Sequence, residues 1–344
     1  MLVLALLNPG WAREKKAQAA EATAPELLLP DGRKLVWQRS FSSDREVRKK
    51  PRFWTKLLDA VAGEPEHHFM VRPYGVAVDS HGRVIVSDPG AEGIHIFDVE
   101  KQKYKFIERR YKSKDSLKAP QCIAVDASDN IYVTDSESGR ILVFEPGGKF
   151  QRAIGSLKGG EGFFKRPTGI AVDSAKRKIY VTDTLRNKIF VLDMDGKVEK
   201  TIGEGGSEDG RFNYPTELLR HGDELAVVDA MNFRVQVFDP EGKFQFAIGK
   251  LGDAPGQLFR PKGIGIDSEN HLYIVDGMGG IVQVFNSEGQ LLYAFGGKGA
   301  GPWQFQLPSG MFIDSKDKIY IVDSYNRRIQ VFQYHRVGTA GGAQ

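Results

Sequence analysis

The sequence contains a single cysteine, Cys122, among its 344 residues. One cysteine excludes an internal disulfide, a zinc centre built from cysteine ligands and a haem attached through a Cys-x-x-Cys-His motif. There is no run of about 18 apolar residues, so no segment is expected to cross a membrane as a helix. The formal net charge is only +4, with both signs interspersed, which disfavours nucleic acid as a partner.

What the sequence does contain is a phrase that begins with proline and recurs six times. The third copy, Pro167-Thr-Gly-Ile-Ala-Val-Asp, shows it most clearly. Successive copies lie 47, 47, 48, 46 and 47 residues apart, and so constant a period indicates one supersecondary unit in six copies. The six prolines are Pro73, Pro120, Pro167, Pro215, Pro261 and Pro308.

Each unit is predicted to form a four-stranded sheet. In the third copy the strands are expected at residues 169–173, 179–183, 189–192 and 197–202, with a tight turn at Asp195-Gly196. Four strands in roughly 40–50 residues are typical of a propeller blade. The fold class is therefore all-β, a six-bladed β-propeller over residues 64–344.

The sixth copy lacks a fourth strand of its own. Residues 33–42, which include Leu35-Val36-Trp37, resemble the fourth strands of the other copies. We expect this segment to pair onto the sixth blade, because that closes the ring and hides an open sheet edge.

Residues 1–32 are interpreted as a remnant signal segment and linker. Residues 1–7 are apolar like the end of a secretory h-region, but no positive residue precedes them. A start codon placed too far downstream would explain this pattern. We therefore expect a periplasmic or extracellular protein, and a cytoplasmic one if the start is genuine.

Residues 43–63 have helical rather than strand periodicity. Phe53, Trp54, Leu57, Leu58 and Val61 define one apolar face of a predicted amphipathic helix. The helix either packs against the propeller or docks a partner or a membrane surface. The partner-docking candidates on its basic face are Lys49, Lys50, Arg52 and Lys56.

An aspartate ends the second strand of every unit, and a basic residue follows it in four of them. A residue present in every blade is expected to build the blade, through turn hydrogen bonds and charge pairing, rather than to bind metal. Gly93 and Ile281 replace the base in blades one and five. The aspartates are Asp88, Asp135, Asp183, Asp229, Asp276 and Asp323, and the bases are Arg140, Lys188, Arg234 and Arg328.

Function is more readily expected where the copies differ. The residue after each proline should lie near the ring axis, and it is polar and varied. The next residue is glycine in four copies, which permits close backbone approach, whereas Cys122 and Glu217 stand there in copies two and four. A Cys–Glu pair is too small for a metal site, and local packing variation is the simpler interpretation. The ligand-binding candidates are Tyr74, Gln121, Cys122, Thr168, Thr216, Glu217, Lys262 and Ser309.

The repeated phrases resemble NHL repeats. Arg166-Pro-Thr-Gly-Ile-Ala-Val-Asp, Ile179-Tyr-Val-Thr-Asp and Asn326-Arg-Arg-Ile-Gln-Val-Phe carry the resemblance, which covers roughly residues 73–334. The layout is similar to bacterial exported six-bladed NHL proteins, often encoded near multihaem c-type cytochromes. The resemblance implies a non-catalytic binding or scaffolding platform for a protein or small ligand, with a cytochrome-containing assembly as one candidate partner.

Two other functions are weighed against this one. Lactonase-like and amidating-lyase-like propellers are metal-dependent hydrolases or lyases that act in the axial channel. Here no set of three histidines is expected around the axis, so no metal, cofactor or catalytic residue is assigned. RNA binding by a basic face, as in some animal NHL propellers, is the second alternative and is disfavoured by the modest charge.

Overall fold

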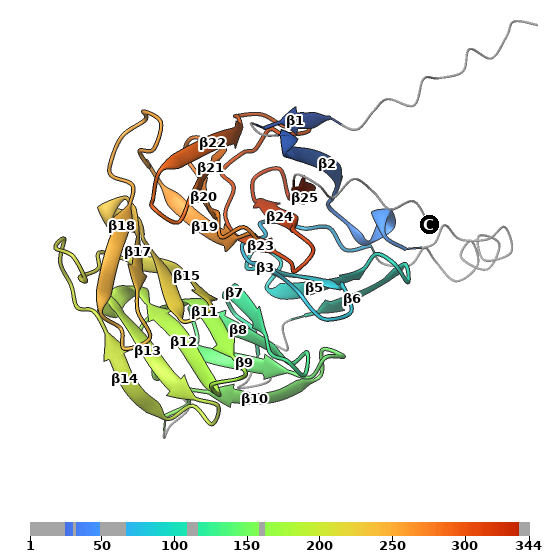
Figure 1. Cartoon of the computed structure of the whole chain (residues 1–344). Helices are drawn as coiled ribbons and strands as arrows, with labels where there is room; N and C mark the ends of the chain where they lie inside the picture. Colours follow the sequence, from blue (N-terminus) through green and yellow to red (C-terminus); the bar gives the residue numbers. More distant parts are fainter. Residues whose placement is uncertain (1–24, 30–31, 49–66, 109–115, 158–161, 337–344) are drawn as a thin grey trace, which may run out of the picture.

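The computed structural model describes residues 25–29, 32–48, 67–108, 116–157 and 162–336, and these form a ring of six antiparallel sheets (Figure 1). The prediction of a six-bladed propeller is confirmed. Most of the predicted helix at residues 43–63, with its four basic docking candidates, lies outside the described residues, and Asp44–Glu46 forms a 3-10 turn. No helix long and apolar enough to span a membrane occurs in the described part of the chain.

Each of the first five blades is a meander of four consecutive strands. Blade one contains β3 (Val76–Val78), β4 (Val84–Asp88), β5 (Gly93–Asp98) and β6 (Lys103–Ile107). Blade two contains β7 (Pro120–Val125), β8 (Ile131–Asp135), β9 (Arg140–Phe144) and β10 (Phe150–Ile154). Blade three contains β11 (Pro167–Asp173), β12 (Lys178–Asp183), β13 (Lys188–Asp193) and β14 (Val198–Ile202).

The later blades repeat this order. Blade four contains β15 (Pro215–His221), β16 (Glu224–Asp229), β17 (Arg234–Phe238) and β18 (Phe244–Ile248). Blade five contains β19 (Pro261–Ile266), β20 (Leu272–Asp276), β21 (Ile281–Phe285) and β22 (Leu291–Gly296). Blade six contains β23 (Met311–Ile313), β24 (Lys318–Asp323) and β25 (Arg328–His335), followed by two strands from the N-terminal region, β2 (Lys34–Phe41) and β1 (Glu26–Leu28).

The core lies between adjacent blades. The second and third strands are β-branched and aromatic on both faces, as in Ile131-Tyr132-Val133, because neighbouring blades cover both faces of the sheet. The fourth strands are half-exposed, which fits their position at the rim. Each blade therefore buries its apolar side chains only against its neighbours, as a closed ring of repeats requires.

The predicted ring closure is confirmed. Strand β2 pairs antiparallel with β25, placing Trp37 opposite Phe332, and the Trp37 indole N–H donates to Gln330 Oε1 at 3.0 Å. Strand β1 then adds a fifth strand outside β2, within the segment expected to be a linker. Beyond β2, the Met70 N–H donates to the Ser42 carbonyl at 2.9 Å, which ties the closing strand to the start of blade one.

The repeated aspartates build the blades. Asp88 accepts the backbone N–H groups of Val71 and Arg72 at 2.6 and 2.9 Å, just before the proline of the same blade. Corresponding backbone bonds reach the other five aspartates. These bonds hold each inner strand against its second strand.

The expected charge pairs form at two blades, and a different pair forms at blade three. Arg234 and Arg328 reach Asp229 and Asp323 at 3.0 and 2.7 Å. At blade three the prediction is wrong, because Arg186 rather than Lys188 pairs with the aspartate, at 3.2 Å. At blade one, buried His95 lies 3.4 Å from Asp88.

Candidate binding site at the channel mouth

The innermost strands approach one another very closely where they begin. A Cβ atom on Gly75 would lie 2.7 Å from the Gln121 carbonyl oxygen, and one on Gly310 would lie 2.5 Å from that of Tyr74. Such contacts are shorter than van der Waals distances, so glycine is required there, as predicted. The proline end of the inner strands is consequently a narrow mouth at the centre of the ring.

Cys122 and Glu217 meet at this mouth although they belong to blades two and four. The Cys122 thiol donates to Glu217 Oε2 at 3.0 Å. Burial raises the pKa of the Cys122 thiol well above its usual value, and the Glu217 carboxylate raises it further. Burial likewise raises the pKa of Glu217 to about 7. The two departures from the glycine pattern therefore form one hydrogen-bonded pair, which local packing variation alone would not require.

Lys262 and Tyr74 lie beside this pair. The Lys262 ammonium is 5.9 Å from the centroid of the Tyr74 ring, within the range of a cation–π contact. Burial, reinforced by Arg260, lowers the pKa of Lys262 to about 8. Burial also raises the pKa of Tyr74 well above its usual value, and Cys122 and Glu217 add to that shift. Four of the predicted ring residues thus interact electrostatically across the axis.

Three other residues predicted to bind a ligand use their side chains for hydrogen bonds within the propeller. The Thr168 hydroxyl bonds those of Thr182 and Thr184 at 2.9 and 2.7 Å. Ser309 donates to the Tyr74 carbonyl at 2.8 Å, and the Gln121 amide to that of Ala119 at 3.3 Å.

Thr216 differs from these three residues. Its hydroxyl is buried and has no hydrogen-bond partner within the described ranges. A buried hydroxyl left unpaired is costly, so Thr216 is a strained point of the scaffold.

Two arginines at the mouth were missed by the sequence reasoning. Arg166 and Arg260 are exposed, directly precede the prolines of blades three and five, and act electrostatically on both Tyr74 and Lys262. Arg72 holds the same place in blade one. The recurrence of arginine at this position in alternate blades was the available signal. Together with Lys262, these side chains make the mouth electropositive.

Below the Cys122–Glu217 pair the axis is an apolar channel. It encloses about 200 Å³ and contains no histidine among the described residues that line it. The described histidines lie in turns, in loops, on β5 and at the ends of β15 and β25. Residues that line the channel include Val76, Ile123, Ile170, Leu218, Ile264 and Met311.

Most of the exposed large hydrophobic side chains of the described residues lie on the face around the mouth. We call it the proline face; it consists of the connectors before each proline and the turns between second and third strands. Among the described residues, twelve large hydrophobic side chains are exposed, and ten of them belong to this face. They are Phe69, Val71, Leu157, Leu185, Tyr214, Met231, Leu251, Phe259, Met278 and Tyr325.

Comparison with protein families agrees with this architecture. A family model described as a 6-bladed beta-propeller matches residues 114–203 and 206–283, and the NHL repeat model matches residues 305–332. The chain is a six-bladed β-propeller, and its last blade matches the NHL repeat. Among curated proteins none matches it.

Solved structures share the fold at low sequence identity. A streptogramin B lyase is 17% identical with a TM-score of 0.56, covering 76% of this chain and 93% of its own. An auxiliary nutrient binding protein from Bacteroides thetaiotaomicron is 14% identical with a TM-score of 0.59, covering 78% and 70%. A chain of a nidogen/laminin complex is 18% identical with a TM-score of 0.52, covering 78% and 92%. These likenesses establish the fold alone.

Proposed function

We propose that this protein is a non-catalytic binding platform that docks a protein partner on its proline face. The observation that carries the proposal is the gathering of ten of the twelve exposed large hydrophobic side chains on that face. Monomeric proteins rarely expose contiguous apolar surface without a use for it, and rings of repeats commonly present one face to a partner.

The channel mouth supplies an anchor at the centre of this face. A carboxylate of the partner, from a side chain or a chain terminus, would be attracted by Lys262 and by the exposed Arg166 and Arg260. The partner is therefore expected to combine an apolar surface with an acidic group.

Two solved neighbours make a binding role plausible for this fold. One is named a nutrient binding protein and another is part of a nidogen/laminin complex. Export to the periplasm or cell exterior, and membership of an assembly that contains a cytochrome, are further parts of this proposal. They derive from the N-terminal sequence and from the resemblance to exported NHL proteins.

The experiment compares cross-linked partners of the wild type with those of two variants in the native host. Tyr214→Ser with Phe259→Ser removes two exposed side chains from the proline face. Leu28→Ser with Val198→Ser removes two exposed side chains elsewhere, and is the matched control. We expect the first pair, and Lys262→Met, to lose a partner that the wild type and the control retain. Equal recovery from all four proteins would refute docking on this face.

A hydrolase or lyase acting in the channel is the second candidate. Glu217 favours it, because a carboxyl with a pKa of about 7 is suited to general acid–base catalysis at neutral pH. Screening the purified protein against lactones and peptide-derived lactones, with and without added divalent metal, tests this. An activity that disappears in Glu217→Gln would replace the binding proposal.

A further inference from the structure

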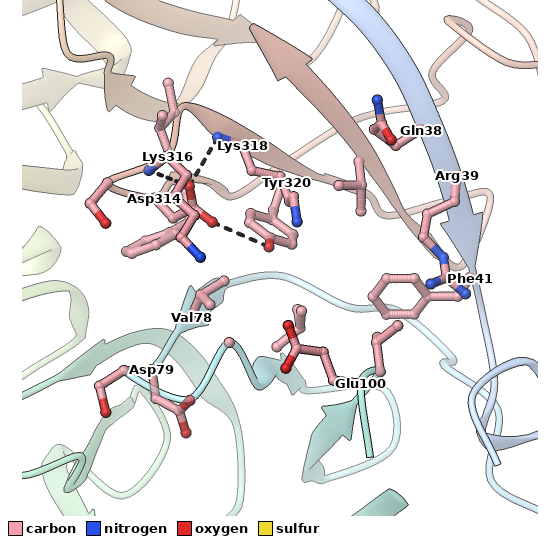
Figure 2. A pocket seen from close by; sticks show the side chains of 18 residues that line it. Gln38, Arg39, Phe41, Val78, Asp79, Glu100, Asp314, Lys316, Lys318 and Tyr320 are labelled. Atoms are coloured by element: carbon pink, nitrogen blue, oxygen red, sulfur yellow. Dashed lines mark hydrogen bonds between the residues drawn. The ribbon is translucent and has the colours of Figure 1, made fainter. Parts of the chain in front are cut away.

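A groove separates blades six and one on the face opposite to the prolines. It encloses about 540 Å³, within the usual range for small-molecule sites. Figure 2 shows Arg39 and Phe41 of β2 on one side, Asp314, Lys318 and Tyr320 of blade six on another, and Val78, Asp79 and Glu100 of blade one opposite. This is the seam at which the ring closes.

At three other blade junctions the residue in register with Arg39 links its blade to the next one, and we call this contact a latch. In the pairing of β2 with β25, Arg39 lies opposite Val331. The corresponding position of the fourth strand is Lys105 in blade one, Arg152 in blade two and Lys200 in blade three. Each of these three side chains donates to a backbone carbonyl in the strand 3–4 turn of the next blade, with Arg152 reaching Met194 at 2.8 Å and Lys200 reaching Pro240 at 3.1 Å.

The latch is missing at the seam because the turn it would reach is different. In blades two to five this turn contains a glycine with positive φ, as at Gly148 and Gly196. The final isoleucine of the preceding blade packs directly on that glycine, as Ile107 does on Gly148. The turn of blade one, residues 98–103, is one residue longer than its counterpart at 193–197, and Gln102 takes the positive φ.

The seam therefore remains open where other junctions are filled. Among the described residues, Arg39 forms no hydrogen bond to the turn of blade one. The equivalent gap between blades four and five holds only about 60 Å³, with Phe246 in the register position of Arg39. The groove is a local departure from the repeat rather than a general property of the ring.

The charges that line the groove are not equally available. Asp79 is paired with Arg83 at 2.5 Å, and Asp314 accepts the backbone N–H groups of Lys316 and Lys318 at 2.9 and 3.0 Å. The Asp79 charge is therefore neutralised, which leaves Asp314 and Glu100 as the unpaired acids of the groove. Arg39, Lys316 and Lys318 have no carboxylate partner within the described ranges, so the cations outnumber the acids and the groove favours an anion.

The walls between these charges are apolar. Val78, Val99, Phe312 and Ile313 are half-buried and line the groove, with Phe41 and Tyr320 buried behind them. An exposed acid, Glu100, also lines the groove, where it can accept from a hydroxyl group. Cations beside an apolar wall suit a ligand that carries a carboxylate on a planar apolar body.

We propose that the seam groove is a second binding site, which takes a small aromatic carboxylate. The Arg39 guanidinium binds the carboxylate, with Lys318 contributing charge, and the ring lies against Val78 and Phe312. A hydroxyl on the far side of the ring donates to Glu100. The site is separate from the channel mouth and does not rest on partner docking there.

Saturation-transfer NMR and calorimetry with the full chain test this proposal. The probes are benzoate, 4-hydroxybenzoate, 4-hydroxycinnamate and indole-3-acetate, each beside its neutral amide. We expect the carboxylates to bind and the amides not to bind. Arg39→Gln should raise Kd roughly tenfold or more, because a charge-assisted bond is lost.

Two further variants separate this site from alternatives. Arg152→Gln changes the same register position in blade two, where the side chain is a latch. It should lower the melting temperature and leave binding intact, and Lys262→Met at the channel mouth should also leave binding intact. The proposal is overturned if no carboxylate binds, if the amides bind equally well, or if Arg39→Gln binds like the wild type.

Discussion

The Cys122 thiol and the Glu217 carboxylate lie 3.0 Å apart across the ring axis, one from blade two and the other from blade four. They occupy the two positions where the glycine of the inner strand is replaced. Their pairing places a titratable pair between a polar mouth and an apolar channel.

The pH dependence of stability should report this buried pair. The pKa of Glu217 is about 7 in the folded protein and 4.5 ordinarily. The contribution of Glu217 to the free energy of unfolding is fully present below pH 4.5. It falls as the pH rises to about 7, because Glu217 loses its proton at a lower pH in the unfolded chain than in the folded protein. The pKa of Lys262 falls from 10.5 to about 8, so the free energy of unfolding should rise again between these values.

Urea unfolding between pH 4.5 and 10 measures both slopes. Each group should change the free energy of unfolding by about 1–3 kcal/mol over its range. The Glu217→Gln/Lys262→Met double variant should show a flatter profile than the wild type. An unchanged profile would mean that these side chains are solvated in the folded protein.

Cys122 should be nearly unreactive in the folded protein. Its thiol is buried, and the raised pKa keeps it protonated, whereas the thiolate is the species that alkylating agents attack. Iodoacetamide at pH 8, followed by mass spectrometry, should label the unfolded chain at least about a hundredfold faster than the native protein. Comparable rates in the two states would place the thiol at an open surface.

The ring and its closing strand could be predicted from the sequence because both depend on local patterns. The alternation of apolar residues in each strand, and the absence of a fourth strand from the sixth copy, are visible within a single repeat. The meeting of Cys122 with Glu217 could not be read in this way, since it depends on ring geometry and not on any single blade. Similarly, the absence of a glycine from the turn at residues 98–103 is visible in the sequence, but its effect appears only once β2 faces this turn across the seam.

The repeated aspartates should contribute strongly to stability. Asp323 accepts from the Gln306 backbone N–H at 2.7 Å, from Asn326 at 2.8 Å and from Arg328 at 2.7 Å, all at a fully buried carboxylate. Asp323→Asn should lower the free energy of unfolding by about 2–4 kcal/mol, because it leaves a mostly buried guanidinium without its counterion. Chemical denaturation measures this loss.

A double-mutant cycle identifies the source of that loss. Arg328→Gln should cost less in the Asp323→Asn background than in the wild type, because the charge pair is already broken. Additive effects of the two substitutions would show that the pair contributes nothing beyond the separate backbone bonds.

Deleting residues 33–42 should destabilise the ring more than any single substitution. The deletion removes β2, which supplies the fourth strand of blade six, and it exposes the edge of β25. It also removes the buried side chains of Leu35 and Phe41 from two different core clusters. We expect a loss of several kcal/mol and a melting temperature well below that of the full chain.

The control is Trp37→Phe, which keeps the strand and an aromatic ring but removes the 3.0 Å bond to Gln330. It should cost only about 1 kcal/mol. A truncated protein that melts with the full-length chain would show that blade six closes without β2.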